Sequence, residues 1–220
     1  MSNTDESIFR EVDDEVRQDE YKKIFDRYGK HFVALAVALL VAVGGYQAWI
    51  FYQQKQAEDA GAVYFAALRK AADGKSEDAL AALAAVSHPG FGQLAALQSA
   101  ALMAGKGDVD KAVAAYDVFA ANSSNDPALA DLARIRAGYL LVDTGKTDDL
   151  KARMAGFDKD GAAWRNEARE ILGLVAWRAK DYANAEKDMT AIVQDAAAPS
   201  AMHQRAQIML QLIAPNLPKK

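Results

Sequence analysis

Hydrophobic positions follow two different patterns along the chain, and the first is an uninterrupted apolar run at residues 32–51. The run is FVALAVALLVAVGGYQAWIF and contains no charged residue. Twenty helical residues rise by roughly 30 Å, which matches the hydrocarbon core of a bilayer. A buried core helix is the alternative, but such helices are rarely apolar on every side over this length. The pattern therefore predicts a transmembrane helix at 32–51.

The end of this run favours a retained anchor over a cleaved signal peptide. Tyr46, Trp49 and Tyr52 lie where an interfacial aromatic belt is expected. These bulky side chains leave no small-residue cleavage site, and the segment that precedes the run is long and rich in acids.

The basic residues near the run predict its orientation. Four basic residues precede the run closely: Lys22, Lys23, Arg27 and Lys30. Only one, Lys55, follows it within fifteen residues. Basic residues next to a span stay on the cytoplasmic side. We therefore expect residues 1–31 in the cytoplasm and residues 53–220 on the far side of the membrane.

Residues 1–31 carry nine acidic and six basic side chains, with apolar residues at three- and four-residue spacings. This spacing predicts a short amphipathic helix that leads into the span. Two interpretations remain open for it. The tail rests on the membrane surface, or it is a cytosolic docking or degradation element.

The second pattern is helical periodicity with regular breaks after the span. Four breaks lie 33 to 38 residues apart, at Gly74-Lys75, Gly107-Asp108, Gly145-Lys146 and Lys180-Asp181. A tetratricopeptide repeat has a period of about 34 residues and consists of two helices. The pattern predicts an all-α solenoid of helix hairpins at 53–220, with a capping helix at 200–213.

The unit at 169–197 matches this repeat best. Gly173 is a small residue where the second helix must cross the first, and Ala185 is the small residue that faces it. Trp177 matches the aromatic position that fills the space beside the next repeat, and Asp181 and Tyr182 match the turn. A single unit cannot bury its apolar face alone, so stacking of units provides the stability.

Composition agrees with helices and excludes several functions. About half of the residues are apolar, many of them alanine, the best helix former. The net charge of −4 gives no basic surface for nucleic acid. There is no cysteine, so disulfides, thiolate catalysis and cysteine-ligated zinc are excluded.

We expect neither catalysis nor a cofactor nor a metal. His31, His88 and His203 have no ligand spacing, and no Ser/His/Asp set or paired carboxylates are present. The Gly-Lys pairs at residues 74–75 and 145–146 lack the earlier glycine of a phosphate-binding loop. They are interpreted as turns between helices.

Binding chemistry is predicted on the concave face, which the first helix of each repeat supplies. The expected lining is Tyr64, Leu68, Leu94, Leu97, Leu132, Ile135, Tyr139, Leu174 and Trp177. This mostly apolar set favours hydrophobic segments of other proteins. The alternative is that a neighbouring helix fills the groove and that these residues belong to the core.

The chain resembles the bacterial tetratricopeptide-repeat-like inner-membrane proteins that include the ancillary subunit of the Sec translocon. The matching features are the acidic EVDDEVR segment, Tyr28-Gly29-Lys30 before the span, residues 45–49 at its end, and YQQKQAEDAGAVY after it. The resemblance implies a periplasmic repeat domain anchored in the inner membrane. Its implied partners are the translocon, periplasmic chaperones and exported client proteins.

Two functional hypotheses follow. The first is a membrane-tethered chaperone or adaptor that binds exported chains. The second is a scaffold that assembles a different envelope complex and does not touch unfolded clients. An apolar groove favours the first hypothesis.

Overall fold

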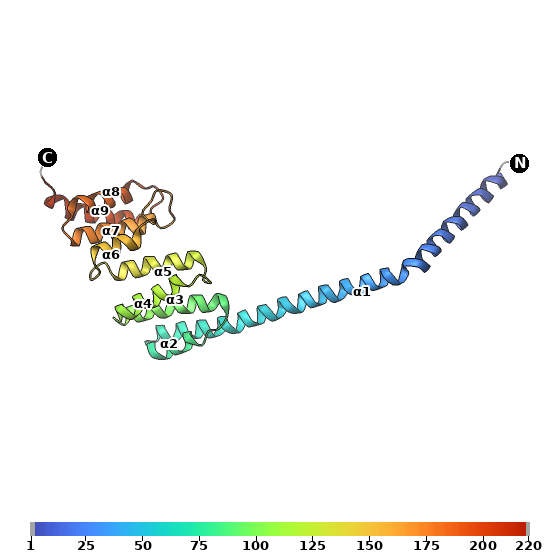
Figure 1. Ribbon diagram of the computed structural model, residues 1–220, viewed down its shortest axis with the longest axis horizontal. Coiled ribbons are helices and arrows are strands. Elements are labelled where there is room, and N and C mark those ends of the chain that lie inside the picture. Colours follow the sequence, from blue (N-terminus) through green and yellow to red (C-terminus); the bar gives the residue numbers. More distant parts are fainter. Residues whose placement is uncertain (1–2, 219–220) are drawn as a thin grey trace. The chain divides into compact units, whose positions relative to one another are not determined.

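The computed structural model describes residues 3–218, with side chains from residue 27 onward. Every regular element in this part of the chain is helical, which confirms the all-α prediction. The elements are α1 (Asn3–Ala72), α2 (Ser76–Ala84), α3 (Pro89–Gly105), α4 (Val109–Ala121), α5 (Pro127–Leu140), α6 (Thr147–Met154), α7 (Arg165–Arg178), α8 (Tyr182–Gln194), α9 (Ser200–Ile213) and a 3-10 turn, η1 (Ala214–Asn216) (Figure 1).

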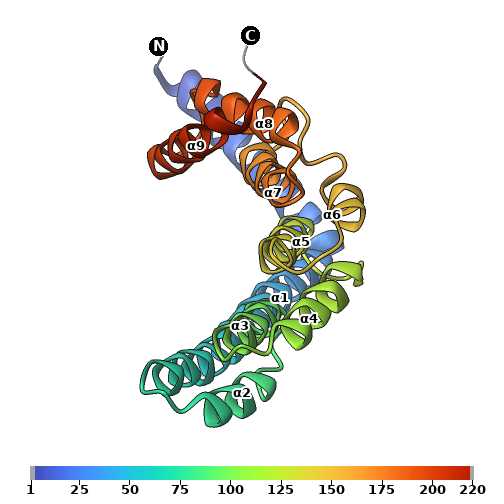
Figure 2. The ribbon, with the colours of Figure 1, turned by 90° about the vertical axis from the view of Figure 1, so that its left-hand side faces the viewer.

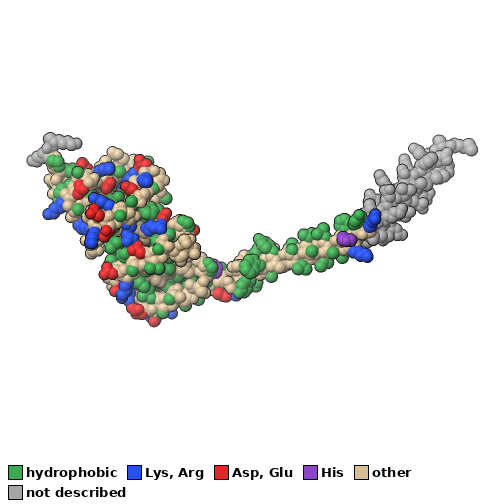
Figure 3. Space-filling view, viewed as in Figure 1, with side chains coloured by type: hydrophobic (Ala, Val, Ile, Leu, Met, Phe, Trp, Pro, Cys, Tyr) green, Lys and Arg blue, Asp and Glu red, His purple; other side chains and the backbone are tan. Residues whose placement is uncertain are grey.

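The predicted span lies within α1. This helix contains a segment that is long and apolar enough to cross a membrane, and none of that segment is buried in protein. Its hydrophobic side chains stand out from the helix in Figure 3. The predicted amphipathic face of the tail falls mostly on residues 1–26, whose side chains lie outside the described part.

Contacts divide the chain into two compact units between Glu58 and Asp59. The second unit holds the end of α1 and all later helices. In it, helices pair as hairpins: the end of α1 with α2, α3 with α4, α5 with α6, and α7 with α8. The four predicted breaks all fall between the helices of a hairpin, and α9 packs on α8 as the predicted cap.

The first helices and the second helices form two layers of this unit. Figure 2 shows α3, α5, α7 and α9 along the inner side of a curve, with α4, α6 and α8 along the outer side. Exposure differs among the first helices: Leu94 on α3 and Arg136 on α5 are exposed, whereas every residue of α7 is at least partly buried.

One register of buried residues repeats in every hairpin. Seven residues before each break, the first helix has a buried small residue: Ala67, Ala100, Gly138 and Gly173. Five and nine residues after each break, the second helix buries a pair: Ala79 with Leu83, Ala112 with Tyr116, Leu150 with Met154, and Ala185 with Met189. The predicted crossing at Gly173 and Ala185 is thus general, with Leu150 replacing alanine in the third hairpin.

The two glycines of the register allow helices to approach closely. A Cβ on Gly138 would lie 3.0 Å from the terminal methyls of Ile171 and Met154. A Cβ on Gly173 would lie 2.8 Å from the Met189 methyl. The first helices of the third and fourth hairpins therefore contribute no side chain at the crossing point, where side chains of the second helices pack.

Three of the four turns have the same backbone geometry. Gly74, Gly107 and Lys180 all adopt a left-handed conformation, with φ of 77°, 87° and 62°. The next residue then donates its N–H to a carbonyl five residues earlier, at 2.8 to 3.0 Å. This is the Schellman ending of a helix, in which glycine is favoured because a Cβ is strained there. Lys180 is the exception.

Arginines also join successive hairpins. Arg178 on α7 donates to the carbonyls of Val142 and Gly145 after α5, and Arg153 on α6 pairs with Asp117 on α4. Within the last hairpin, Arg165 and Asn166 on α7 both donate to Asp195 at the end of α8. The Arg165 hydrogen bonds hold the pKa of Asp195 well below its usual range. Polar contacts therefore join successive repeats and also the two helices of the last one.

We expect Lys180→Gly to raise the free energy of unfolding by about 0.5–1 kcal/mol. Glycine removes the strain of a left-handed non-glycine residue, partly offset by its greater freedom in the unfolded chain. Thermal and denaturant unfolding, followed by circular dichroism, measures the change. The matched control is Lys187→Gly, at an exposed position inside α8, which should lower stability by about 1 kcal/mol. Destabilisation by Lys180→Gly would contradict the assigned turn geometry.

Candidate functional site

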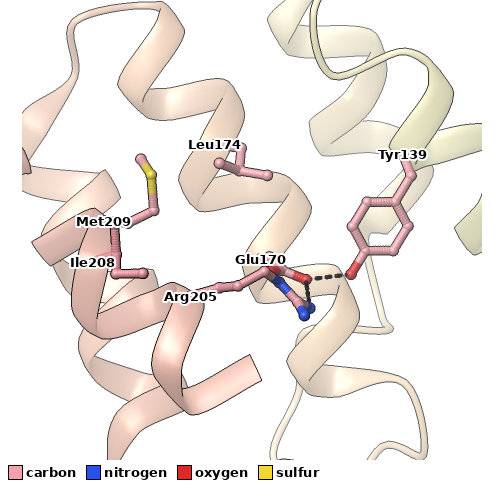
Figure 4. A pocket seen from close by; sticks show the side chains of 6 residues that line it. All are labelled: Tyr139, Glu170, Leu174, Arg205, Ile208 and Met209. Atoms are coloured by element: carbon pink, nitrogen blue, oxygen red, sulfur yellow. Dashed lines mark hydrogen bonds and ion pairs between the residues drawn. The ribbon is translucent and has the colours of Figure 1, made fainter. Parts of the chain in front are cut away.

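A pocket of about 480 Å³ opens among α5, α7 and α9. These are the last helices of the inner layer. Six side chains line the pocket (Figure 4). Tyr139 comes from α5, Glu170 and Leu174 come from α7, and Arg205, Ile208 and Met209 come from α9.

The walls are apolar because α9 ends the stack. Leu174 and Met209 pack partly against the core between α7, α8 and α9. Ile208 is 57% exposed, and Leu212 one turn later is 50% exposed. In the middle of a solenoid, the next hairpin would cover apolar residues such as these. Among the described residues, no hairpin follows α9.

One rim of the pocket is a buried polar network centred on Glu170, which is only 5% exposed. Arg205 donates from Nε and Nη2 to the two Glu170 oxygens, at 2.6 and 2.9 Å. The Tyr139 hydroxyl donates to Oε2 at 2.6 Å. Burial and this hydrogen bond raise the pKa of Tyr139, so its hydroxyl stays protonated. The network ties α5, α7 and α9 together.

Glu170 interrupts the repeat register. It lies ten residues before its break, where the other hairpins have Tyr64, Leu97 and Ile135. A carboxylate at a core position requires partners, because an unpaired buried charge is costly. Sequence reasoning missed Glu170, although a charge at an apolar register position was a usable signal. It also missed Arg205, Ile208 and Met209, because α9 was interpreted only as a cap.

The structure brings together two of the nine predicted groove residues, Tyr139 and Leu174, in this pocket. Leu97 and Ile135 are 4% and 2% exposed, so their assignment to a groove is corrected. They fill the cores between successive hairpins and offer no surface to a partner.

The other five predicted residues lie elsewhere on the same unit. Tyr64 of the first hairpin packs against Phe91 of α3 in the second, and Trp177 packs edge-on against Tyr182. Leu94 is 39% exposed on α3. Leu68 and Leu132 are partly buried, and Leu132 contacts the core of the second hairpin.

Two of the three histidines have structural roles. The Nδ1 of His88 accepts from the Gly90 N–H at 3.2 Å and caps the start of α3. Nε2 of His203 lies 2.9 Å from the carbonyl oxygen of Asp195. Within residues 27–218, no group of three His, Cys, Asp or Glu side chains could hold a metal ion.

Outside the pocket, Asp188 on α8 is a partly buried carboxylate close to Gly173 of α7. Burial raises its pKa to about 6, while Lys187 and Arg169 oppose the shift and Asp158 and Asp181 add to it. Because the shift comes mainly from burial on folding, it makes the stability of the protein depend on pH.

A comparison with protein families places the chain. The model of a family described as a tetratricopeptide repeat-like domain matches residues 22–214. Neither a curated protein nor a solved structure matches the chain.

We expect Tyr139→Phe to lower the free energy of unfolding by about 1–2 kcal/mol, because it removes a hydrogen bond to a buried carboxylate. Thermal unfolding measures this loss. Tyr182→Phe is the matched control, since the Tyr182 hydroxyl has no hydrogen-bond partner among the described residues, and it should change stability by less than about 0.5 kcal/mol. Equal effects of the two variants would remove the hydroxyl of Tyr139 from the network.

Asp188→Asn should stabilise the protein at neutral pH. The folded pKa is raised to about 6, so the stability linked to the protonated form is complete below about pH 4 and is lost as the pH rises through 6. A shift of this size corresponds to about 3 kcal/mol, which solvent screening reduces to about 1–2 kcal/mol for a partly exposed group.

The gain from Asp188→Asn is measured as unfolding free energy from pH 4 to pH 7.5 and should shrink at the acidic end. Glu186→Gln, exposed on the same helix, is the control and should show little pH-dependent gain. A gain for Asp188→Asn that is constant with pH would contradict the raised pKa.

Proposed function

The chain belongs to the tetratricopeptide repeat-like family, and from that premise we propose that it is a membrane-tethered protein-binding module of the bacterial cell envelope. Solenoids of this kind present an extended concave surface to protein partners. The family is typically non-enzymatic and serves protein–protein interaction. Beyond family membership, we propose three things: attachment to the membrane through α1, a periplasmic location of the repeat unit, and exported proteins as the partners.

The tether is the apolar segment of α1. It is long enough to span a bilayer, and its side chains make no protein core that would explain their hydrophobicity. The basic residues before it favour a cytoplasmic N-terminus and a periplasmic repeat unit. Residues 59–220 would then bind their partners close to the outer surface of the inner membrane.

The observation that carries the function is the apolar surface of the inner layer. Leu94 on α3, Leu174 on α7, and Ile208 and Leu212 on α9 remain accessible in full or in part. Exposed apolar side chains along one face indicate a site for hydrophobic segments. We propose that exported chains leaving the translocon supply those segments, in company with periplasmic chaperones. The second candidate is a scaffold for a folded envelope complex.

Binding to an unfolded segment should be weak. Apolar contact contributes roughly 25 cal/mol per Å² removed from water, but ordering a flexible client consumes much of this. A weak and rapidly reversible interaction suits a protein that must release each chain.

Photocrosslinking in living cells tests the function on the full-length protein. A photoreactive amino acid replaces Leu94 on α3 or Tyr139 on α5, and Val118 on α4, which is 73% exposed, is the control position. We expect the inner-layer positions to crosslink to many newly exported chains, at least about fivefold more than the outer-layer control.

Other outcomes separate the alternatives. One discrete folded partner at Leu94 and Tyr139 would replace the chaperone with the scaffold. Equal crosslinking from Val118 would remove the inner layer from the mechanism. Crosslinks to cytoplasmic proteins would overturn the proposed orientation.

A further inference from the structure

The guanidinium of Arg205 can donate paired hydrogen bonds from two edges, and one of these edges is occupied. Glu170 occupies the Nε–Nη2 edge through two hydrogen bonds. On the other edge, Nη1 makes no hydrogen bond within the described residues and Nη2 uses one of its two N–H groups on Glu170, and the side chain is 54% exposed. An arginine carries five N–H donors, and this second edge matches the two oxygens of another carboxylate.

The remaining polar capacity of the pocket consists mainly of donors. Both oxygens of Glu170, the one carboxylate in the lining, already accept hydrogen bonds, three in total. The Tyr139 hydroxyl uses its proton on Glu170. A ligand that brings many N–H or O–H groups into the pocket would find few acceptors, chiefly the lone pairs of the Tyr139 hydroxyl oxygen, and poorly paired donors cost free energy. A ligand that brings acceptors would be matched.

The rest of the lining is hydrocarbon or thioether, from Leu174, Ile208 and Met209. The pocket volume of about 480 Å³ lies within the range of small-molecule sites, which are mostly apolar with a few placed polar groups. Met209 adds an adaptable side chain that can follow a flexible chain. These walls extend away from Arg205 along α9, toward Leu212.

We propose that this pocket binds a carboxylate amphiphile of the fatty-acid class, with its head group on the free fork of Arg205 and its chain against Leu174, Ile208 and Met209. A deprotonated fatty acid has two acceptors and no donor, which is the complement of the pocket. A polypeptide end carries the same carboxylate together with backbone N–H donors, and the competition experiment below distinguishes the two. This pocket shares Leu174 and Ile208 with the client surface proposed above. Its test uses Arg205 and a defined acid, so either proposal can fail without the other.

The network also makes Arg205 selective for head groups. Glu170 neutralises the charge of Arg205, so the attraction for an anion at long range is small. The preference comes instead from the paired hydrogen bonds to a planar carboxylate. Acids should therefore bind better than alcohols with the same chain.

Photolabelling of the full-length chain in lipid nanodiscs tests the proposal. The probe is decanoic acid with a diazirine near the end of its chain, and peptide mass spectrometry locates the label. We expect labelling of the peptides that contain Leu174 and Ile208. Labelling of residues 32–51 by probe dissolved in the lipid serves as the internal reference.

Three comparisons define the expected result. The matching diazirine alcohol should label the pocket at least about fivefold less than the acid, relative to the reference. Arg205→Lys, which keeps the charge but loses the fork, should reduce labelling similarly. Arg136→Gln, at an exposed position of α5, should leave it unchanged. Excess unlabelled decanoate should compete.

Other results would overturn the proposal. Label confined to residues 32–51, or equal labelling by acid and alcohol, would show lipid partitioning alone. Stronger competition by a peptide with a free C-terminus than by decanoate would make the occupant a polypeptide end. Thermal unfolding checks that Arg205→Lys is folded. If it is not, Ile208→Glu places a carboxylate in an already exposed wall and must abolish pocket labelling while sparing the reference. The crosslinking at Leu94 tests client binding independently.

Discussion

The close approach of paired helices is the constraint on which the repeat unit depends. Each first helix has alanine or glycine seven residues before the turn, and each second helix packs two buried residues against that position. At Gly138 and Gly173 even a methyl group would lie 3.0 Å or less from a neighbouring side chain. Such small crossing residues bring helix axes together and fix their angle, because interiors are close-packed. Once four hairpins share this geometry, their inner and outer layers follow.

The candidate site is a consequence of how that repetition ends. Helix α9 packs on α8 but has no following hairpin in the described chain, so Ile208 and Leu212 stay exposed. At the same place, the fourth hairpin has Glu170 where the others have an apolar residue. Arg205 of α9 and Tyr139 of α5 satisfy this carboxylate. The polar network therefore stabilises the last repeat and gives the pocket its one specific rim. An apolar wall beside a fixed hydrogen-bond donor is suited to selective binding.

Membrane attachment changes what weak binding can accomplish. A tethered domain meets ligands and clients at the membrane surface, where a local concentration replaces high affinity. In the proposed function, the apolar segment of α1, which is long enough to cross a membrane, supplies the tether, and the repeat unit begins at Asp59, within the same helix. Client capture by the inner layer and amphiphile binding at α9 would then both draw on molecules that emerge from or reside in the bilayer.

The sequence by itself determined the long apolar segment that is able to span a membrane, the helical class and the four turns. These features are local, because twenty apolar residues, the 3.6-residue period and the glycine at a helix end each act within a short stretch of chain. The small residues at Gly173 and Ala185 were also predictable, since they recur with the repeat. Only the tertiary structure decided which apolar residues are core. Leu97 and Ile135 looked equivalent to Tyr139 along the chain, yet they lie under the next hairpin. Likewise, Glu170 and Arg205 are 35 residues apart, and their pairing depends on how α9 packs across α7. Stacking angles are set by contacts summed over many residues, so no local pattern specifies them.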